Sequence, residues 1–422
     1  MTTMLTNDKV DPNVRDIIAR LVENGHEAYV VGGAIRDILL GISPKDYDIA
    51  TSATPREVKR IFGKKARLIG RRFRLAHIYF GRKYYEVSTF RREPTPEERS
   101  TRAGDDGTII WQDNIYGNLE EDVYRRDFTL NALYADPLNG GEIIDKVGGL
   151  EDIDQRVVRT INDPDTRIAE DPVRIIRALK MVAQYDFRLE PGLDKALEQR
   201  KAEIRKSSVS RLFEELLKIY SGNNTVKTLQ VFHDYGLLAY FLPELDKRWE
   251  TEIGDVMRRL LAERDRRKAA REWYSNSRVL ALITTAFPFI AEEMGTPTIE
   301  DIAAYQPELP SRVTSVIRNL FAPLPVPKRL TARARDAVLL LPKFTTHDHQ
   351  NRLLHHPEYR YARELLSLLT TVMEWDETLV NEWPENGKWR SGSRSGGPPG
   401  RRRRKNPGQR HVQSANQRRN QG

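Results

Sequence analysis

The stretch that decides the fold reads VVGGAIRD over residues 30–37, and DYDI follows it over residues 46–49. An apolar strand runs into a Gly-Gly turn and a short amphipathic helix, after which two carboxylates stand one residue apart. Side chains alternate along a strand, so Asp46 and Asp48 project from the same face with their Cα atoms roughly 7 Å apart. These like charges repel unless a cation, most simply a divalent metal, lies between them. Because the Gly-Gly turn also lets a triphosphate approach backbone N–H groups closely, the combination predicts metal-dependent nucleotidyl transfer.

Each part of this pattern is weak evidence by itself. A Gly-Gly pair is more often a simple tight turn, and an Asp-x-Asp pair at a strand edge is often a solvated face or a turn cap. The ordered combination of strand, Gly-Gly turn, helix and Asp-x-Asp is far more specific. It resembles the pattern of the polymerase-β-like nucleotidyltransferase superfamily, which implies a head domain built on a mixed sheet.

Length and composition limit the class of protein. At 422 residues the chain is too long for one ordinary core, and roughly two to four domains are expected. It contains no cysteine, which excludes disulfides, thiolate zinc sites and cysteine nucleophiles. Residues 1–11 lack the apolar core of a signal peptide, and no window approaches about eighteen consecutive apolar residues. We therefore expect a cytoplasmic protein that does not span a membrane.

The net charge of +9 is concentrated at the C-terminus. Residues 391–422 contain nine of the 69 basic residues and none of the 60 acidic ones, so the rest of the chain is formally neutral. This segment is rich in Gly, Pro, Ser, Gln and Asn and is expected to be disordered. It is either a solubilising terminus or an electrostatic arm for phosphate backbones, with Arg401, Arg402, Arg403, Arg404 and Lys405 at its centre.

Hydrophobic patterning predicts an α+β fold, with a mixed α/β head followed by an all-α body. From residue 167 onward the pattern is overwhelmingly helical. In the head, a helix is expected to start at Thr54, because Thr54, Pro55 and Glu57 form a capping-box pattern. The other elements expected in the head are helices over residues 12–25 and 34–40, strands over residues 26–31 and 47–50, and a hairpin of strands over residues 75–80 and 84–90.

Two further segments carry chemistry. Residues 121–132 read EDVYRRDFTLNA and place acidic and amide side chains beside two arginines. That set suits a triphosphate, although a solvated charged turn is the plain alternative. Residues 170–177 read EDPVRIIR and predict a helix start with Asp171 as the N-cap. Asp171 and Arg174 lie on one helix face with Arg177 one turn further, an acceptor beside donors that can read the edge of a base.

These motifs occur in a family-specific order. The succession VVGGAIRDILLG, KDYDIATSATP, RRDFTLNALY and EDPVRIIRALK is similar to that of class II tRNA nucleotidyltransferases and bacterial poly(A) polymerases, and it covers residues 28 to about 215. Within it, LIGRRFRLAHI at residues 68–78 resembles the poly(A) polymerase signature, where CCA-adding enzymes carry a Gly-Thr-Val-Thr-like run. The segment VPKRLT at residues 326–331 and the basic tail are also similar to those of bacterial poly(A) polymerases.

The resemblance implies a role for each matching residue. Gly32, Gly33 and Arg36 would contact the triphosphate of the incoming nucleotide, and Asp46 and Asp48 would hold two Mg²⁺ ions. Asp127, in the RRDFT motif, is our choice for the third essential carboxylate. Glu86, on an apolar strand as a further metal ligand, also fits, and the sequence alone does not separate the two. The residues expected to position and select the nucleotide are Arg125, Asp171, Arg174 and Arg177.

The resemblance also implies a domain order. It places a catalytic head at residues 1–150, a helical neck with nucleotide-selecting residues at 151–225, a helical body and RNA-binding region at 226–385, and a disordered basic tail at 386–422.

The activity expected from this resemblance is template-independent addition of AMP from ATP to RNA 3′ ends, with Mg²⁺ as cofactor. The runner-up is CCA addition to tRNA, which shares every catalytic motif. A catalytically inactive RNA-binding protein is the third interpretation, and the intact Asp46-x-Asp48 pair argues against it. Expected partners are RNA 3′ ends, ATP and the RNA-decay machinery, and we expect a monomer.

Overall fold

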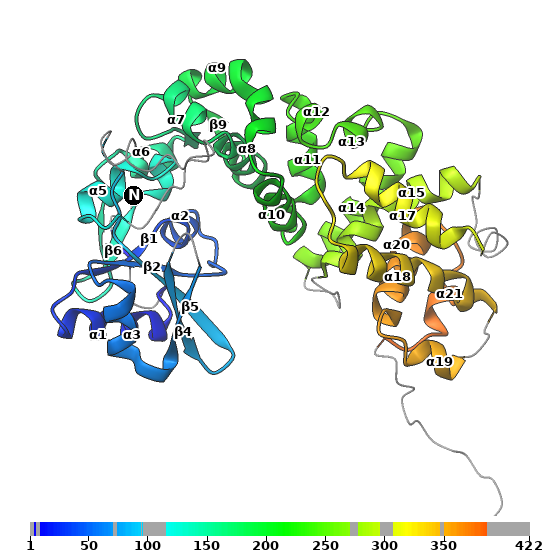
Figure 1. Ribbon diagram of the computed structural model, residues 1–422, viewed down its shortest axis with the longest axis horizontal. Coiled ribbons are helices and arrows are strands. Elements are labelled where there is room, and N and C mark those ends of the chain that lie inside the picture. Colours follow the sequence, from blue (N-terminus) through cyan, green and yellow to red (C-terminus); the bar gives the residue numbers. More distant parts are fainter. Residues whose placement is uncertain are drawn as a thin grey trace, which may run out of the picture.

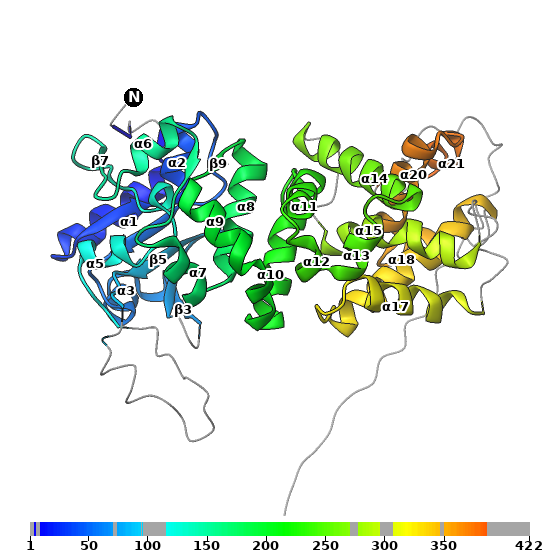
Figure 2. The same cartoon turned by 90° about the horizontal axis from the view of Figure 1, so that it is seen from above.

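The computed structural model describes residues 4–5, 9–70, 74–93, 95, 115–270, 277–295, 307–346 and 350–385. The described residues form an arch, with an α/β head at one end and a helical body at the other (Figure 1). Helices α8 (Val173–Tyr185) and α10 (Val209–Tyr220) lie between the two ends. Figure 2 shows the same separation from above, with the head and body on opposite sides of α10.

A seven-stranded mixed sheet forms the framework of the head. Its strand order is β3-β4-β5-β2-β1-β6-β7. Strands β2 and β5 run parallel, whereas the other neighbours are antiparallel. The predicted hairpin is confirmed as β4 and β5. The strands are β1 (Ala28–Val31), β2 (Asp48–Thr51), β3 (Ala66–Ile69), β4 (Leu75–Phe80), β5 (Lys83–Thr89), β6 (Tyr134–Asp136) and β7 (Glu142–Ile144).

One face of this sheet is covered by α1 (Pro12–Glu23) and α3 (Pro55–Phe62). Helix α3 begins as predicted, because the Thr54 side chain accepts from the Glu57 N–H while the Glu57 carboxylate accepts from the Thr54 N–H. The apolar side chains that these two helices bury in the main core are Val14, Ile17, Ile18, Leu21, Val58 and Phe62. The remaining helices of the head are α2 (Gly33–Leu39), α5 (Leu119–Tyr124), α6 (Gly149–Asp154) and the 3₁₀ turns η2 (Gly63–Lys65) and η3 (Thr129–Asn131).

The opposite face of the sheet has its own small core over β1, β2 and β6. Successive residues of a strand point to opposite faces, and accordingly Val30 belongs to the main core while Val31 belongs to this second cluster. Ala50 of β2 also lies in the second cluster, so Asp48, two residues earlier, projects from the same side of the sheet. The other members are Phe90, Val123, Ala132, Tyr134 and Ile161.

From residue 167 the described chain is helical, as the patterning predicts, apart from the short strand β9 (Arg188–Leu189), which pairs in parallel with β8 (Val157–Val158). In the body, α14 (Glu252–Ala269), α15 (Arg278–Met294), α18 (Lys328–Thr346) and α20 (Tyr359–Met373) pack on one another. The other elements are α7 (Pro164–Glu170), α9 (Pro191–Arg200), η4 (Lys201–Lys206), α11 (Thr225–Asp234), α12 (Leu238–Phe241), α13 (Pro243–Lys247), α17 (Leu309–Leu320), α19 (Gln350–Leu354) and α21 (Thr378–Asn381).

The expected α+β architecture is therefore confirmed, with a mixed-sheet head followed by a helical body. The domain limits at residues 150, 225 and 385 stay predictions. The basic segment at residues 391–422 lies outside the described residues. In the part of the chain that the structure describes, no helix is both long and apolar enough to cross a membrane.

Candidate active site

Strands β2 and β5 bring acidic side chains together at the centre of the sheet. Asp48, the first residue of β2, is in parallel register with Glu86 on β5. Neighbouring strands lie about 4.8 Å apart, so the two carboxylates project side by side from one face. Asp46 lies two residues before Asp48, and on the other side of β2 the register partner of Asp48 is Val31, directly before Gly32. The sheet thus places Glu86, rather than Asp127, beside the Asp46–Asp48 motif.

Electrostatic coupling also joins these carboxylates. Asp48 is exposed, yet the protein around it partly desolvates its carboxyl. That desolvation, with the negative charges of Glu86 and Asp46, raises the pKa of Asp48 to about 6, although the Arg126 guanidinium acts in the opposite direction. Burial likewise raises the pKa of Glu86, and Asp46 adds to the effect while Arg91 opposes it. The cluster is therefore short of positive charge.

A divalent cation would supply that charge. Carboxylates are hard oxygen ligands, so the chemistry of Asp46, Asp48 and Glu86 fits such an ion. Among the described residues, no three His, Asp or Glu side chains converge into a ready-made metal site. Asp46, Asp48 and Glu86 would then supply one or two carboxylate ligands to the cation, and substrate phosphates and water would supply the others.

The Gly-Gly turn packs tightly against the segment that follows α5. Gly32 has φ of +74°, a conformation that L side chains rarely adopt, and a Cβ there would lie 3.2 Å from the Asn131 carbonyl oxygen. The Gly32 N–H donates to the Leu133 carbonyl oxygen at 2.9 Å. This glycine therefore serves close packing within the head. The contact of Gly32 and Gly33 with a triphosphate stays a prediction.

Arg36 is buried, with 7% of its surface exposed, and its guanidinium is bonded to protein acceptors. Its Nη1 donates to Asn131 Oδ1 at 2.7 Å. Its Nη2 donates to the Tyr185 hydroxyl at 2.6 Å and to Asp37 Oδ1 at 2.7 Å, and Tyr185 donates to the same Asp37 oxygen at 2.8 Å. Because Tyr185 ends α8 and Asn131 lies in the head, Arg36 connects the two parts. A direct contact between Arg36 and the triphosphate stays a prediction.

Asp122 organises the arginines of the 121–132 segment. It is buried, and its carboxylate accepts from Arg125, Arg126 and the Tyr134 hydroxyl. Burial alone would raise the pKa of Asp122, but the Arg126 and Arg125 guanidiniums hold it below its usual range. Arg126 is thereby held near enough to Asp48 to lower the pKa of that carboxyl. Arg125 was predicted from the sequence and Arg126 was not, since the contact with Tyr134 that fixes Arg126 depends on the folded sheet.

Asp127 has a different set of partners from the Asp48 cluster. It is 8% exposed, and its Oδ2 lies 2.9 Å from Nη2 of Arg177 on α8. Its Oδ1 accepts from the Phe128 N–H at 2.9 Å and from Asn131 Nδ2 at 3.3 Å. Although burial alone would raise it, the pKa of Asp127 is held below its usual range by Arg177 and these hydrogen bonds. Asp127 therefore positions Arg177, whose side chain is 48% exposed at the head–neck boundary.

The two residues expected to read a base have separate partners at the start of α8. Asp171 accepts from the Val173 N–H at 3.2 Å, and its Oδ2 accepts from Arg211 of α10 at 2.8 Å. Helix α8 starts at Val173, so its N-cap is Pro172. The prediction of Asp171 as the N-cap is therefore wrong, because an N-cap directly precedes the first helical residue. Arg174 Nη1 donates to the Arg167 carbonyl oxygen at 2.5 Å and to Glu170 at 3.2 Å.

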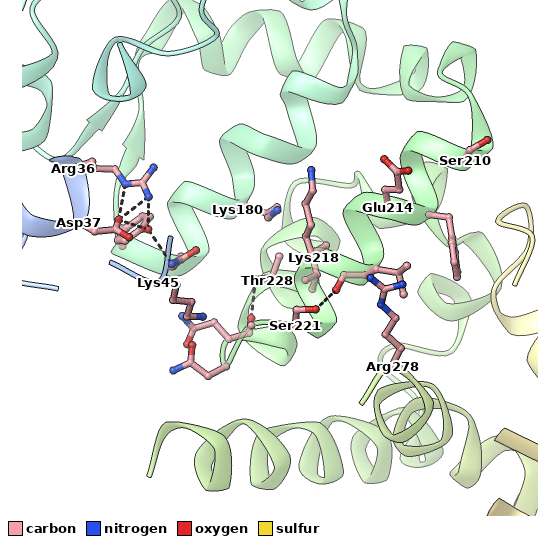
Figure 3. Close-up of a pocket in the computed structure, with 18 of the residues that line it drawn as sticks. Arg36, Asp37, Lys45, Lys180, Ser210, Glu214, Lys218, Ser221, Thr228 and Arg278 are labelled. Atoms are coloured by element: carbon pink, nitrogen blue, oxygen red, sulfur yellow. Dashed lines mark hydrogen bonds and ion pairs between the residues drawn. The ribbon is translucent and has the colours of Figure 1, made fainter. Parts of the chain in front are cut away.

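A pocket of about 840 Å³ opens between the head and the helices on its body side (Figure 3). Its basic lining consists of Arg36 and Lys45 on the head side, Lys180 of α8, Lys218 of α10 and Arg278 of α15. The Lys218 charge acts to lower the pKa of Glu86, so it reaches the acidic cluster. This distribution of charge is suited to a polyanion that passes the carboxylates.

Two sets of predicted residues cannot be placed. Residues 71–73 of the 68–78 signature, and the basic cluster Arg401, Arg402, Arg403, Arg404 and Lys405, lie outside the described residues.

Comparison with known proteins identifies the family. The chain matches the model of the poly A polymerase head domain over residues 28–159, and a second model, described as the probable RNA and SrmB-binding site of polymerase A, over residues 186–248. Poly(A) polymerase I of Salmonella typhi is 34% identical over 392 residues, which cover 90% of this chain and 83% of that protein. The chain belongs to the poly(A) polymerase and tRNA nucleotidyltransferase family. It is a nucleotidyltransferase that acts on RNA.

CCA-adding enzymes of the same family match as well. That of Lactobacillus helveticus is 37% identical over 218 residues, which cover 52% of each chain. The solved structure of the Bacillus stearothermophilus CCA-adding enzyme in complex with CTP has a TM-score of 0.58 and 26% sequence identity, over 88% of this chain and 82% of that one. The head and helical body are thus shared with both kinds of enzyme.

Proposed function

We propose that the protein adds AMP from ATP to RNA 3′ ends without a template. One observation carries this choice within the family. The sequence similarity to poly(A) polymerase I extends over 90% of the chain, whereas the sequence similarity to the CCA-adding enzymes of Lactobacillus helveticus and Geobacillus thermodenitrificans extends over 52% and 61%. The match to poly(A) polymerase I therefore extends well beyond the catalytic motifs that the two activities share.

In the proposed reaction the 3′-hydroxyl of RNA attacks the α-phosphate of ATP in line and releases pyrophosphate. Asp46, Asp48 and Glu86 would hold Mg²⁺, which when bound lowers the pKa of an attacking hydroxyl and stabilises charge on phosphate oxygens. Glu86 is the third carboxylate in this proposal because it is the register partner of Asp48. Arg126, held by Asp122 and Tyr134, offers positive charge beside the same cluster.

Nucleotide selection is assigned to the start of α8 and the loop before it. Asp127 holds Arg177 at the head–neck boundary, and Arg174 lies one turn before Arg177 on the same helix. Asp171 and Arg174 offer an acceptor and donors to the edge of a base, and Arg125 extends the donors from the head. The role of Arg36 in this proposal is to keep this helix in place through Tyr185.

RNA is proposed to approach along the basic pocket, where Lys180 and Lys218 face the cleft (Figure 3). Both lysines pair with the single carboxylate of Glu215, so the three side chains together keep a net charge of about +1 for phosphates. The basic tail, with Arg401–Arg404 and Lys405, is proposed to add affinity for RNA without sequence preference.

One experiment separates this function from CCA addition. Purified protein is incubated with a generic RNA 3′ end or with a tRNA that lacks its CCA end, and with each nucleoside triphosphate separately. We expect long products from ATP on both RNAs and little incorporation of CTP. Addition of C, C and A to the truncated tRNA followed by a stop would establish the CCA-adding activity instead.

A further inference from the structure

The open face of the sheet continues beyond the carboxylates as a row of aromatic and basic side chains. The register pairs Asp48 with Glu86, Glu86 with His77 of β4, and His77 with Arg67 of β3. Residues in direct register on adjacent strands project from the same face. One line across four strands therefore runs from the acidic cluster to the edge of the head.

A second line lies one pleat further along the same strands. Tyr79 of β4 is the register partner of Tyr84 of β5. Tyr84 is two residues from Glu86, or about 7 Å along the strand, and shares its face. The alternate residues of these strands, Ala76, Ile78, Tyr85 and Val87, are buried in the main core.

The aromatic rings on this face form one set of contacts, with one stacked pair and a tilted third ring. The His77 and Tyr84 rings are stacked, with centroids 4.4 Å apart and planes at 16°, and the Tyr79 centroid lies 5.8 Å from that of Tyr84. The Arg67 guanidinium lies 5.1 Å from the centre of the Tyr79 ring. Tyr84 nevertheless keeps 52% of its surface exposed.

This exposure is more than the hairpin needs for its own stability. Cross-strand aromatic pairs stabilise antiparallel strands through their mutual contact, and the half of the Tyr84 surface that stays exposed adds nothing to that contact. The face also adjoins the acidic cluster through the contact between His77 Nε2 and Glu86 Oε2 at 3.7 Å. Figure 1 shows β4 and β5 on the side of the head toward the helical body.

We propose that His77, Tyr79 and Tyr84 form a stacking platform for the last bases of single-stranded RNA, with Arg67 beside it for the phosphates. The proposal rests on the proposed function, because it takes the RNA 3′ end to lie at Asp48 and Glu86. Aromatic rings with adjacent positive charge are the common means of binding single strands, because every base presents a π face. The platform would bind nucleotides that are already part of the RNA, next to the nucleotide that carries the 3′-hydroxyl.

The test uses the full chain and a short oligoadenylate that carries 2-aminopurine next to its 3′-terminal nucleotide, without ATP. Stacking quenches 2-aminopurine fluorescence. We expect Tyr84→Leu, which keeps an apolar side chain suited to a strand, to reduce the quenching and to weaken RNA binding about 5-fold to 150-fold. Tyr84→Phe keeps the ring and is expected to retain both. Tyr361→Leu is the matched control, because Tyr361 lies on α20 in the body with the Arg333 guanidinium over its ring.

Several outcomes would overturn the platform. Binding and quenching by Tyr84→Leu within about twofold of the wild-type protein would do so, as would an equal loss in Tyr84→Phe, since the hydroxyl and not the ring would then be responsible. A raised KM for ATP with unchanged RNA affinity would assign these rings to the incoming nucleotide instead. If Tyr84→Leu lowers the melting temperature, Tyr79→Leu is compared by the same quenching assay.

Because the binding assay contains no ATP, it separates the two proposals. Quenching by wild-type protein that adds no AMP would contradict the proposed function alone. AMP addition with unchanged quenching in Tyr84→Leu would contradict the platform alone.

Discussion

Replacing Glu86 by Gln tests whether the β2–β5 register creates the acidic cluster. The amide has the shape of the carboxylate but no charge, so the variant removes one negative neighbour of Asp48 and leaves the strand pairing intact. Since the ionised carboxylate of Asp48 then meets less electrostatic repulsion, the pKa of Asp48 falls from about 6 toward its ordinary value. An activity that needs ionised Asp48 to hold a metal declines as the pH drops through this pKa, so any residual activity of the variant should persist to lower pH.

The size of the shift follows from the sheet geometry. Register partners on adjacent strands put the two carboxylates roughly 5–6 Å apart, where unit charges repel by about 0.7–3 kcal/mol for effective dielectric constants of about 80 to 20. The Glu86 side chain is 40% exposed and Asp48 also contacts solvent, so the lower part of that range applies. We therefore expect the pKa of Asp48 to fall by roughly 0.5–1 unit.

The measurement is a carbon-13 NMR titration of aspartate carboxyl carbons in metal-free protein. Glu142→Gln is the matched control, because Glu142 is an exposed carboxylate on β7 at the far edge of the same sheet. An Asp48 midpoint that is the same in Glu86→Gln, the control and the wild-type protein would refute the electrostatic reasoning. AMP transfer is then compared with that of Asp127→Asn. Near-complete loss in Asp127→Asn together with more than about a tenth of the activity in Glu86→Gln would make Asp127 the third carboxylate.

Three other predictions concern catalysis, selection and RNA affinity. Asp46→Asn and Asp48→Asn should keep the melting temperature close to wild type and reduce AMP transfer in Mg²⁺ by about a thousandfold or more, and more than about a tenth of wild-type activity in either would contradict their role. Arg174→Ala should cost about 1–3 kcal/mol of discrimination for ATP over CTP, measured as the ratio of their kcat/KM values, whereas equal losses for both would indicate a general phosphate contact. Truncation after Arg390 should weaken RNA binding, shorten the products made per encounter and leave the rate at saturating RNA nearly unchanged. The salt dependence of binding should become shallower, by about 0.7 counterions per lost phosphate contact, and identical salt slopes would reduce the tail to a solubilising terminus.

Local patterns account for the parts of the site that the sequence predicts. Strand, Gly-Gly turn, helix and Asp-x-Asp occupy one continuous segment, so their order and the fold class follow from neighbouring residues. The choice between Glu86 and Asp127 does not, because it depends on the parallel pairing of Asp48 with a residue beyond two intervening strands. Sequence shows that Glu86 lies between apolar residues, but not which strand becomes its neighbour.

Arg36 illustrates a second limit of sequence reasoning. Its position beside the Gly-Gly turn suggested a phosphate contact, and its family motif supported that interpretation. Its acceptors, Asn131 and Tyr185, are far away along the chain, and only the packing of α8 on the head brings them to α2. The buried partners of Asp122 were missed for the same reason, because Tyr134 meets it across the folded sheet.

The bond between Arg36 and Tyr185 has a consequence for protein engineering. Chimaeras that exchange the predicted neck, residues 151–225, between relatives are an obvious way to transfer nucleotide preference, and here the exchanged segment would carry the whole of α8, including Tyr185. Such a graft that brings a different residue to position 185 would leave a buried guanidinium with fewer acceptors and would release Asp37 from one of its donors. The head of a successful chimaera must therefore be chosen with its neck, since α8, which carries Arg174, is hydrogen-bonded through Tyr185 to Arg36 and Asp37 of α2.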